Sequence, residues 1–174
     1  MRLFIAINFS TETRSRLIAL RDELRARSEQ GKFSTQENLH LTLAFLGECD
    51  AKQTTSVKAA MDAVGFGLLP VNIERVGRFK RDGGDIWWAG ISESKTLLDL
   101  QRSLTNELIA SGFTLEKRKY SPHITLGREV VTDASPQILE GFEETISKIE
   151  LMKSERICGK LIYTPIYEKR SEIP

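Results

Sequence analysis

Apolar and polar positions along the chain predict short strands and amphipathic helices. Apolar side chains fill most of Leu3–Asn8, as in a short buried strand. Ser10 stands where a helix cap is expected, and Leu17, Leu20 and Leu24 then recur at helical spacing among arginines and glutamates. The chain is therefore expected to begin with a buried strand followed by a helix.

The rest of the first half continues this mixture. The pattern predicts a strand at Asn38–Leu46, a helix at Ala51–Val64 and a half-exposed strand at Val71–Val76. A turn at 81–84, which contains two adjacent glycines, leads to a hairpin partner at Ile86–Ile91. The first half should thus combine antiparallel strands with two helices.

The second half is expected to repeat part of this order. Leucines at helical spacing predict a helix around Leu97–Leu108, which ends near Gly112 because glycine favours the end of a helix. Ser135-Pro136 resembles a helix start. The remaining elements are a strand, a helix and two final strands, over residues 122–127, 135–147, 149–151 and 160–163.

Two of these strands carry the same pattern, and it contains both histidines of the chain. His40 and Thr42 are separated by one apolar residue, as are His123 and Thr125. Side chains two apart project to the same face of a strand, so each motif places an imidazole beside a hydroxyl. Imidazole exchanges protons near neutral pH. The repeated pattern predicts acid–base chemistry on a group rich in oxygen acceptors, with phosphate as the leading candidate.

A helix followed by a motif strand occurs in both halves, and this repetition predicts the fold. We expect an α+β fold with two similar lobes, each a mostly antiparallel sheet with outer helices. The lobes should face one another across a central cleft, to which each contributes one motif. No linker or low-complexity segment divides the chain, so residues 1–174 are expected to form a single bilobal domain.

The composition is that of an ordinary globular protein, with 40% apolar and 28% charged residues. Its net charge of +1 provides no global positive field, so a polyanion must bind to a local patch. No segment approaches the length of a membrane span, and the apolar N-terminal run is too short for a signal peptide. Cys49 and Cys158 are expected to stay reduced. These features predict a cytoplasmic monomer with no membrane partner.

Two alternative roles for the histidines are less favoured. A histidine on a strand is often a hydrogen-bonded core group, but that role has to account for two identical contexts. Zinc usually takes three or four protein ligands, and neither histidine has a Cys or His neighbour at ligand spacing. A metal site that used both histidines would need distant carboxylates. We therefore expect neither a metal nor another cofactor.

Three segments resemble the bacterial and archaeal RNA 2′,3′-cyclic phosphodiesterases, also named 2′-5′ RNA ligases, of the two-histidine phosphoesterase superfamily. They are Arg2–Ile7, Asn38–Gly47 and Tyr120–Arg128, and the similarity extends over essentially the whole chain. One such motif carries little information, whereas two in these flanking strings are specific. One departure is Phe33, where many members have tryptophan, and it concerns packing near the first motif.

The resemblance implies a role for each residue of the site. His40 acts as proton donor and His123 as proton acceptor, an assignment that the sequence symmetry does not make. Thr42 and Thr125 hold phosphate oxygens, and Arg128 contacts phosphate or nucleotide. The implied reaction is metal-independent hydrolysis of a terminal 2′,3′-cyclic phosphate on RNA, which gives a 2′-phosphate and a free 3′-hydroxyl. In reverse, the same site would join RNA ends through a 2′-5′ linkage.

The expected partners are RNA ends or nucleotides that carry a 2′,3′-cyclic phosphate. Phe9 and Phe45 near strand ends, and Arg118 just before the second motif, are candidates for RNA contact because aromatic rings and cations hold single-stranded RNA. Two alternatives stay open. One is a nucleotide-binding module without useful turnover, and the other is a phosphodiesterase that acts on a different small cyclic phosphate.

Overall fold

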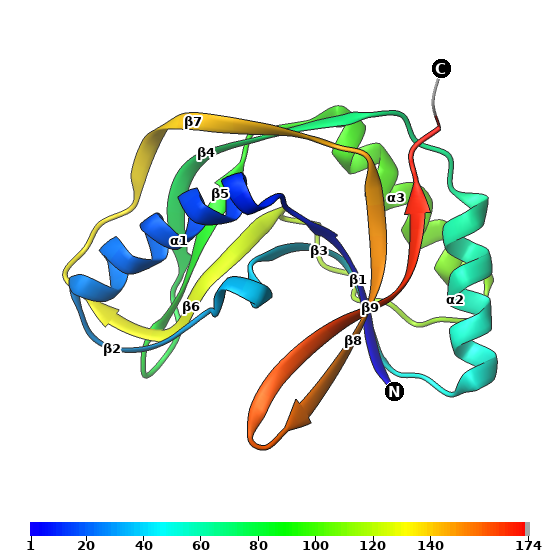
Figure 1. Cartoon of the computed structure of the whole chain (residues 1–174), viewed down its shortest axis with the longest axis horizontal. Coiled ribbons are helices and arrows are strands. Elements are labelled where there is room, and N and C mark those ends of the chain that lie inside the picture. The colour runs from blue at the N-terminus through cyan, green and yellow to red at the C-terminus, as the bar shows by residue number, and fades with distance from the viewer. Residues whose placement is uncertain (173–174) are drawn as a thin grey trace.

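The computed structural model describes residues 1–172, which form two antiparallel sheets and three α-helices (Figure 1). The four-stranded sheet has the order β3-β1-β8-β9 and the five-stranded sheet the order β2-β6-β5-β4-β7. The helices are α1 (Thr11–Ala26), α2 (Ala51–Ala63) and α3 (Lys95–Ala110), and a short 3₁₀ helix, η1, spans Gln36–Asn38. The strands are β1 (Arg2–Asn8), β2 (Ser28–Phe33), β3 (His40–Glu48), β4 (Leu69–Phe79), β5 (Asp85–Ile91), β6 (His123–Thr132), β7 (Gln137–Ile146), β8 (Lys148–Ile157) and β9 (Lys160–Arg170).

The two sheets repeat one arrangement, which confirms the expected α+β fold with two related lobes. The order β3-β1-β8-β9 corresponds to β6-β5-β4-β7, and β2 is added at the edge of the second sheet. Strand β8, from the second half of the chain, pairs with β1, and β4, from the first half, pairs with β7 from the second. Each half therefore supplies strands to the other half's sheet. The motif strands β3 and β6 occupy equivalent positions in the two sheets.

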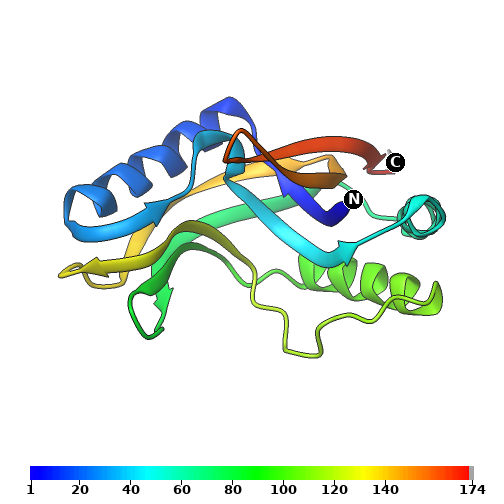
Figure 2. The ribbon, with the colours of Figure 1, turned by 90° about the horizontal axis from the view of Figure 1, so that it is seen from below.

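The helices also cross between the lobes. Helix α1 follows β1 of the four-stranded sheet, but it contacts β2, β6 and β7 of the five-stranded sheet. Helix α3 follows β5, but it contacts β3 of the other sheet as well as β4 and α2. Figure 2 shows α1 and α3 on opposite sides of the strands. None of the helices within residues 1–172 is long and apolar enough to cross a membrane.

Local sequence signals explain where the helices begin and end. The Ser10 side chain accepts a hydrogen bond from the Thr13 amide at 3.3 Å, which confirms the expected cap of α1. Asp50 and Gln53 form a reciprocal capping box at the start of α2. Gly112 follows the end of α3 with φ of 96°, a left-handed conformation that glycine adopts without strain.

One predicted element is wrong. Residues 135–147 were expected to form a helix, but Gln137–Ile146 is the edge strand β7, paired with β4. A break in register between the two strands, and Gly141 with φ of 90°, interrupt the alternation that marks a strand. As an edge strand, β7 also leaves Ile138 89% exposed. The apolar and polar positions therefore did not follow a simple period of two.

Other differences concern the limits of strands. Strand β2 has almost no apolar residues and was not predicted, because main-chain pairing with β6 forms it. Strand β3 begins at His40 rather than Asn38, since Gln36–Asn38 turns as a 3₁₀ helix. Strands β8 and β9 are much longer than predicted and form a hairpin that projects beyond the body of the molecule (Figure 1).

Strand β1 is buried on both faces, and this matters for the site. Leu3, Ile5 and Ile7 are fully buried in the main core. On the opposite face, Phe4 and Ala6 form a small separate cluster with Met152 of β8, against which Tyr163 of β9 packs. Burial of apolar surface on both faces stabilises β1, and β3 pairs directly with β1. The first motif thus pairs with a strand that is packed on both sides.

Candidate active site

The two motif strands present their histidines and threonines in the same way. Strands β3 and β6 contact each other where the two sheets meet. In each strand the His and Thr are partly accessible, whereas the apolar residues between and after them are buried. The apolar residues are Leu41, Leu43, Ile124 and Leu126. The prediction that each imidazole shares a face with a hydroxyl is confirmed.

A bulge follows the threonine in both motif strands. In the first, Ala6 pairs with Thr42 but Ile5 pairs with Ala44, so one step along β1 spans two along β3. In the second, Trp88 pairs with Thr125 but Trp87 pairs with Gly127. An extra residue reverses the faces of the residues beyond it. A side chain five positions after the histidine, which alternation would direct into the core, therefore returns to the histidine face.

Arg128 and Phe45 occupy these positions, five residues after His123 and His40. Arg128 is exposed, and its charge lowers the pKa of His40 and of His123. Phe45 is 55% exposed and stacks on Phe4 with ring centroids 5.8 Å apart. The Phe4 ring in turn lies 4.9 Å from that of His40. The repeated bulge thus brings a cation from one lobe and an aromatic ring from the other to the histidines.

An aromatic ring packs edge-to-face against each imidazole. His40 lies 5.2 Å from Tyr163 at an interplanar angle of 72°, and His123 lies 5.1 Å from Phe79 at 89°. Trp88 also approaches His123, with centroids 6.4 Å apart. Edge-to-face packing of this kind favours one ring orientation. Both imidazoles are therefore oriented by packing as well as by their strands.

The backbone fixes the tautomer of His123. Its Nδ1 lies 2.7 Å from the carbonyl oxygen of Ser121, and a carbonyl only accepts, so Nδ1 carries the proton and donates it. In the neutral ring, Nε2 is then left with a lone pair. The Nδ1 of His40 is buried without a hydrogen-bond partner among residues 1–172. The two histidines are thus related by symmetry of position but differ in environment.

Burial makes both histidines harder to protonate. It lowers the pKa of His40 from its ordinary 6.5 to about 4. The nearby backbone of Asn38 acts to raise this pKa, and the charge of Arg128 lowers it further. Burial also lowers the pKa of His123, although the hydrogen bond to Ser121 opposes this and Arg128 again adds to it. Because one guanidinium acts on both imidazoles, the two motifs share one electrostatic environment. An anion bound there would favour protonation of either ring.

The threonines are held through their main chains. The Tyr120 hydroxyl donates to the carbonyl of Thr42 at 2.7 Å, and the Ser34 hydroxyl donates to the carbonyl of Thr125 at 2.8 Å. Burial raises the pKa of Tyr120, which keeps this donor protonated. Among residues 1–172, neither threonine hydroxyl donates a hydrogen bond of its own. Both remain able to donate to a ligand on the histidine face.

The three residues expected to contact RNA lie in different places. Phe45 presents an exposed ring beside the first motif. Phe9 is 3% exposed within the main core, so we do not propose an RNA contact for it. Arg118 lies in the segment before β6 and pairs with Glu116. Its charge is compensated there, and we do not propose an RNA contact for it either.

Several residues near the histidines were not predicted from the sequence. They are Phe4, Phe79, Trp88 and Tyr163. Trp88 belongs to a pair in which one indole was expected in the core, and that indole is Trp87, 1% exposed. Tyr163 is far from His40 along the chain, and only the pairing of β9 with β8 brings it close. No local sequence signal indicates that neighbour.

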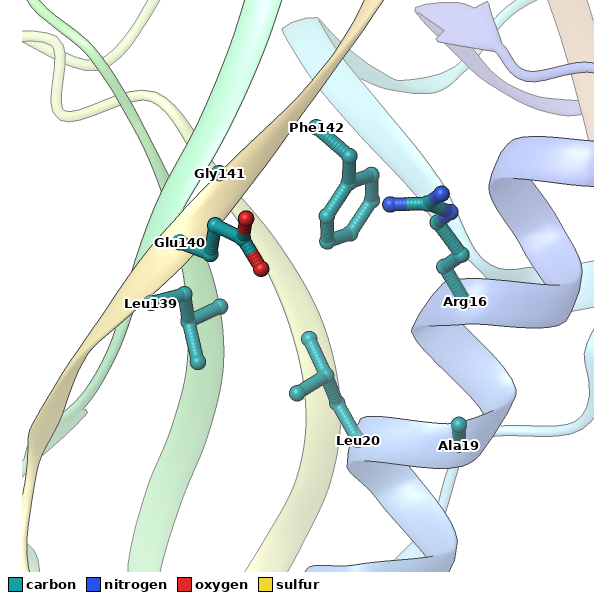
Figure 3. Close-up of a pocket in the computed structure, with 7 residues that line it drawn as sticks. All are labelled: Arg16, Ala19, Leu20, Leu139, Glu140, Gly141 and Phe142. Atoms are coloured by element: carbon teal, nitrogen blue, oxygen red, sulfur yellow. The ribbon is translucent and has the colours of Figure 1, made fainter.

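A groove on the surface lies apart from these residues. It has a volume of about 520 Å³ and lies between α1 and β7, with Arg16 and Leu20 facing Leu139 and Phe142 (Figure 3). None of its lining residues belongs to a motif strand. Within residues 1–172, no three His, Cys, Asp or Glu side chains gather closely enough to hold a metal ion.

Comparison with known proteins identifies relatives over the full length of the chain. Residues 7–88 and 90–163 match the family model described as LigT like Phosphoesterase, and each segment contains one motif. The RNA 2′,3′-cyclic phosphodiesterase of Thermotoga maritima is 29% identical over 99% of this chain and 96% of its own length. The enzyme of the same name from Methanothermobacter thermautotrophicus is 29% identical over 99% of this chain and 91% of its own.

Solved structures show the same fold. LigT of Escherichia coli in complex with 3′-AMP superposes with a TM-score of 0.87 at 25% identity, over 98% of this chain and 97% of that one. LigT in complex with NADP+ superposes with a TM-score of 0.84 at 26% identity, over 98% of this chain and 96% of that one. The similarity covers both sheets and both motif strands.

Proposed function

The chain belongs to the LigT-like phosphoesterase family and is a phosphodiesterase, and we propose that it hydrolyses the 2′,3′-cyclic phosphate at RNA ends to a 2′-phosphate. The observation that carries the proposal is that the two His–Thr strands contact each other and that a bulge returns the exposed Arg128 to the histidine face of one of them. Two proton carriers and an anion-binding cation in one site are what opening a cyclic phosphate requires.

The proposed reaction breaks the bond between phosphorus and the 3′-oxygen. Water attacks phosphorus opposite that oxygen, and His123 accepts the water proton as the new P–O bond forms. His40 gives a proton to the departing 3′-oxygen, which leaves as a hydroxyl. The products are a 2′-phosphomonoester and a free 3′-hydroxyl. Each proton transfer contributes typically about 10²–10⁴-fold in rate.

The environment of each histidine supports this assignment of roles. The hydrogen bond from His123 Nδ1 to Ser121 leaves Nε2 unprotonated in the neutral ring, as a base requires. The pKa of His40 is held at about 4 in the free protein by burial, so the ring is neutral at pH 7. The negative charge of a bound phosphodiester favours the imidazolium and raises that pKa. Substrate binding thus prepares the acid.

The remaining groups stabilise the charge on phosphate. We propose that the hydroxyls of Thr42 and Thr125 donate to the non-bridging oxygens, where charge is concentrated in the transition state. The exposed guanidinium of Arg128 would bind the same phosphate through two parallel hydrogen bonds. The exposed Phe45 ring, which stacks on the Phe4 ring that packs against His40, would stack on the base of the terminal nucleotide. No base-reading contact is expected, so selectivity for sequence should be low.

The same geometry permits the reverse reaction. A 5′-hydroxyl in place of water would attack the cyclic phosphate and form a 2′-5′ linkage, with the same proton transfers. We also propose that nucleotides bind in this site, as LigT of E. coli binds 3′-AMP and ATP. We expect the protein to act as a cytoplasmic monomer without metal or other cofactor.

A paired binding and turnover experiment tests the proposal. Wild type should hydrolyse an RNA oligonucleotide that ends in 2′,3′-cyclic phosphate, and His40→Ala or His123→Ala should reduce kcat by about 10²–10⁴-fold. Both variants should still bind 3′-AMP within a few-fold of wild type, since Arg128 and the threonines are intact. A protein that binds 3′-AMP but does not turn over any cyclic phosphate would instead be a nucleotide-binding module.

A further inference from the structure

The histidine face of the four-stranded sheet continues beyond the motif toward the β8–β9 hairpin. Arg2 of β1 pairs with Ser154 of β8, and Ser154 pairs with Tyr163 of β9, so the three form a row across the sheet. Arg156 lies two residues further along β8 and therefore on the same face. The row begins next to the first motif, because the Tyr163 ring packs against that of His40 at 5.2 Å.

The two arginines on this face keep their charges available. Within residues 1–172, neither Arg2 nor Arg156 takes part in an ion pair. Arg156 donates only to the carbonyl of Gly159, at 3.4 Å, and the Arg2 guanidinium lies over the Phe45 ring, 5.8 Å from its centroid. Glu155 points to the other face, where Lys153 pairs with it at 3.0 Å. Two carboxylates share the face, Glu48 as cross-strand partner of Arg2 and Glu150 as cross-strand partner of Ala6. Glu48 pairs with the terminal amine of Met1 at 3.5 Å and Glu150 with Lys148 at 3.8 Å, so within residues 1–172 both arginines stay free of ion pairs.

Tyr163 links this face to the catalytic residues. Burial raises the pKa of its hydroxyl. The positive charges of Arg128, Arg2 and Arg156, with Arg128 the strongest of the three, act to lower that pKa. The charges of three guanidinium groups therefore act on the phenol, and one of them, that of Arg128, also acts on both histidines. Its hydroxyl makes no hydrogen bond among residues 1–172 and stays protonated near neutral pH. It is a neutral donor in a cationic environment.

The spacing fits a chain of phosphates. Residues two apart on a strand are separated by about 7 Å, which is comparable to the distance between successive phosphates in an extended single strand. The hairpin carries this face outward from the body of the molecule (Figure 1). A 2′,3′-cyclic phosphate is the 3′ end of its RNA, so further phosphates exist only on the 5′ side of the terminal nucleoside. The base of the terminal nucleoside would stack on Phe45, which lies along the strand between His40 and the position opposite Arg2.

We propose that Arg2, Arg156 and the Tyr163 hydroxyl form a second anion subsite, which binds the phosphodiester on the 5′ side of the terminal nucleoside. This inference rests on the proposed function and narrows the substrate to oligonucleotides over free cyclic mononucleotides. The catalytic phosphate and the next one would then be held by separate sets of cations on one continuous face. Phosphate contacts of this type are independent of base sequence.

Three substrates and two variants test the subsite. The substrates are a 2′,3′-cyclic mononucleotide, a dinucleotide with the same cyclic end, and that dinucleotide with an uncharged methylphosphonate linkage. Wild type should show kcat/KM about 10-fold or more higher for the charged dinucleotide than for the other two. Arg156→Gln should remove most of that advantage and leave the mononucleotide unchanged. Lys153→Gln, on the opposite face of β8, is the matched control and should behave as wild type.

The salt dependence gives a second readout. For the charged dinucleotide, the negative slope of log(kcat/KM) against log salt concentration should become less steep by about 0.7 in Arg156→Gln, as expected for one lost phosphate contact on a single strand. Arg2→Gln should act in the same direction. If Arg2→Gln does not fold, the exposed Arg156 still provides the test. Equal losses on mononucleotide and dinucleotide, or no loss on either, would overturn the subsite.

Binding separates this inference from the function on which it rests. The ligands are the corresponding mononucleotide and dinucleotide with a terminal 2′-phosphate. Wild type should bind the dinucleotide more tightly than the mononucleotide, and Arg156→Gln should lose this difference. That outcome supports the subsite even if the protein turns over no cyclic phosphate. Absence of turnover would refute only the proposed function. Equal binding of the two ligands by wild type would overturn the subsite, whatever the turnover.

Discussion

Phe45 and Arg128 are symmetry-related residues with different chemistry. Each lies five positions after a motif histidine, and each reaches the histidine face because a one-residue bulge follows the motif threonine. The duplicated strand therefore supplies the same proton carrier and hydroxyl twice, but a ring from one lobe and a guanidinium from the other. In the proposed mechanism, the two lobes contribute equally to acid–base chemistry and unequally to substrate binding.

Arg128 is expected to contribute both binding and electrostatics. Arg128→Gln should reduce kcat/KM by about 10²–10³-fold, because the charge that stabilises the phosphate in the transition state is lost. The same substitution should raise the pKa of both histidines, since the Arg128 charge lowers them in wild type. NMR titration of the two imidazoles in the variant and in wild type measures this directly. Unshifted titrations would place Arg128 outside the site.

Phe45 is expected to contribute to binding alone. Phe45→Ala should raise KM for nucleotide substrates by about 10-fold, which corresponds to the loss of one base stack, and change kcat little. Ile138→Ala is a control, because it also removes an exposed apolar side chain, from β7. A large fall in kcat with unchanged KM would show instead that Phe45 supports the packing around His40.

The pH dependence of kcat/KM should be bell-shaped and acidic. The productive form of the free enzyme has one imidazole protonated and the other neutral, and it is most abundant between the two pKa values. The pKa of His40 is about 4, and burial holds that of His123 below its ordinary 6.5. The maximum should therefore lie between about pH 4 and 6.5, whichever ring is the acid. The profile of kcat should lie at higher pH, because the bound anion favours protonation.

His40 should make the fold sensitive to acid. Its pKa is lower in the folded protein than in the unfolded chain, so folding favours the neutral ring. The corresponding stability is complete above about pH 6.5 and is lost as the pH falls toward 4. The loss amounts to at most roughly 3 kcal/mol. Urea unfolding at pH 7.5 and 4.5 should show a smaller decrease in His40→Gln than in wild type. Equal decreases would mean that His40 is more accessible to water than the structure indicates.

Tyr120 should position the first motif from behind. Tyr120→Phe removes the donor to the Thr42 carbonyl and should lower the free energy of unfolding by about 1 kcal/mol. It should also reduce kcat about 10-fold, because β3 is less constrained beside the substrate. Tyr167→Phe is the matched control, since it removes a hydroxyl bonded to Asp62 away from both motifs. Loss of stability in Tyr120→Phe without loss of kcat would make the contact purely structural.

The sequence was informative wherever short-range chemistry decides the structure. The capped helices, the glycine after α3 and the two motif strands could all be predicted, because each depends on residues within a few positions. Strand β7 and strand β2 could not, because pairing with β4 and β6 overrides their local patterns. Edge strands of this kind expose much of their surface and need little apolar periodicity.

In the site too, features that depend on neighbouring residues could be predicted, and features that depend on strand pairing could not. His40, His123 and the two threonines were predicted as site residues from their spacing, and the structure places the His and Thr of each strand on one face. Alternation alone would have directed Arg128 and Phe45 into the core, and the bulges that prevent this depend on how β1 and β5 pair with the motif strands. Tyr163 was missed because its position beside His40 depends on the pairing of β9 with β8.

The central claim is that His40 and His123 open a cyclic phosphate at an RNA end without a metal. The most direct test is hydrolysis, in EDTA, of an oligonucleotide ending in 2′,3′-cyclic phosphate, with the product isomer identified. We predict undiminished turnover that yields only the 2′-phosphate and falls by about 10²–10⁴-fold in His40→Ala and in His123→Ala. A 3′-phosphate product, a requirement for added metal, or no turnover by folded wild type would contradict the account.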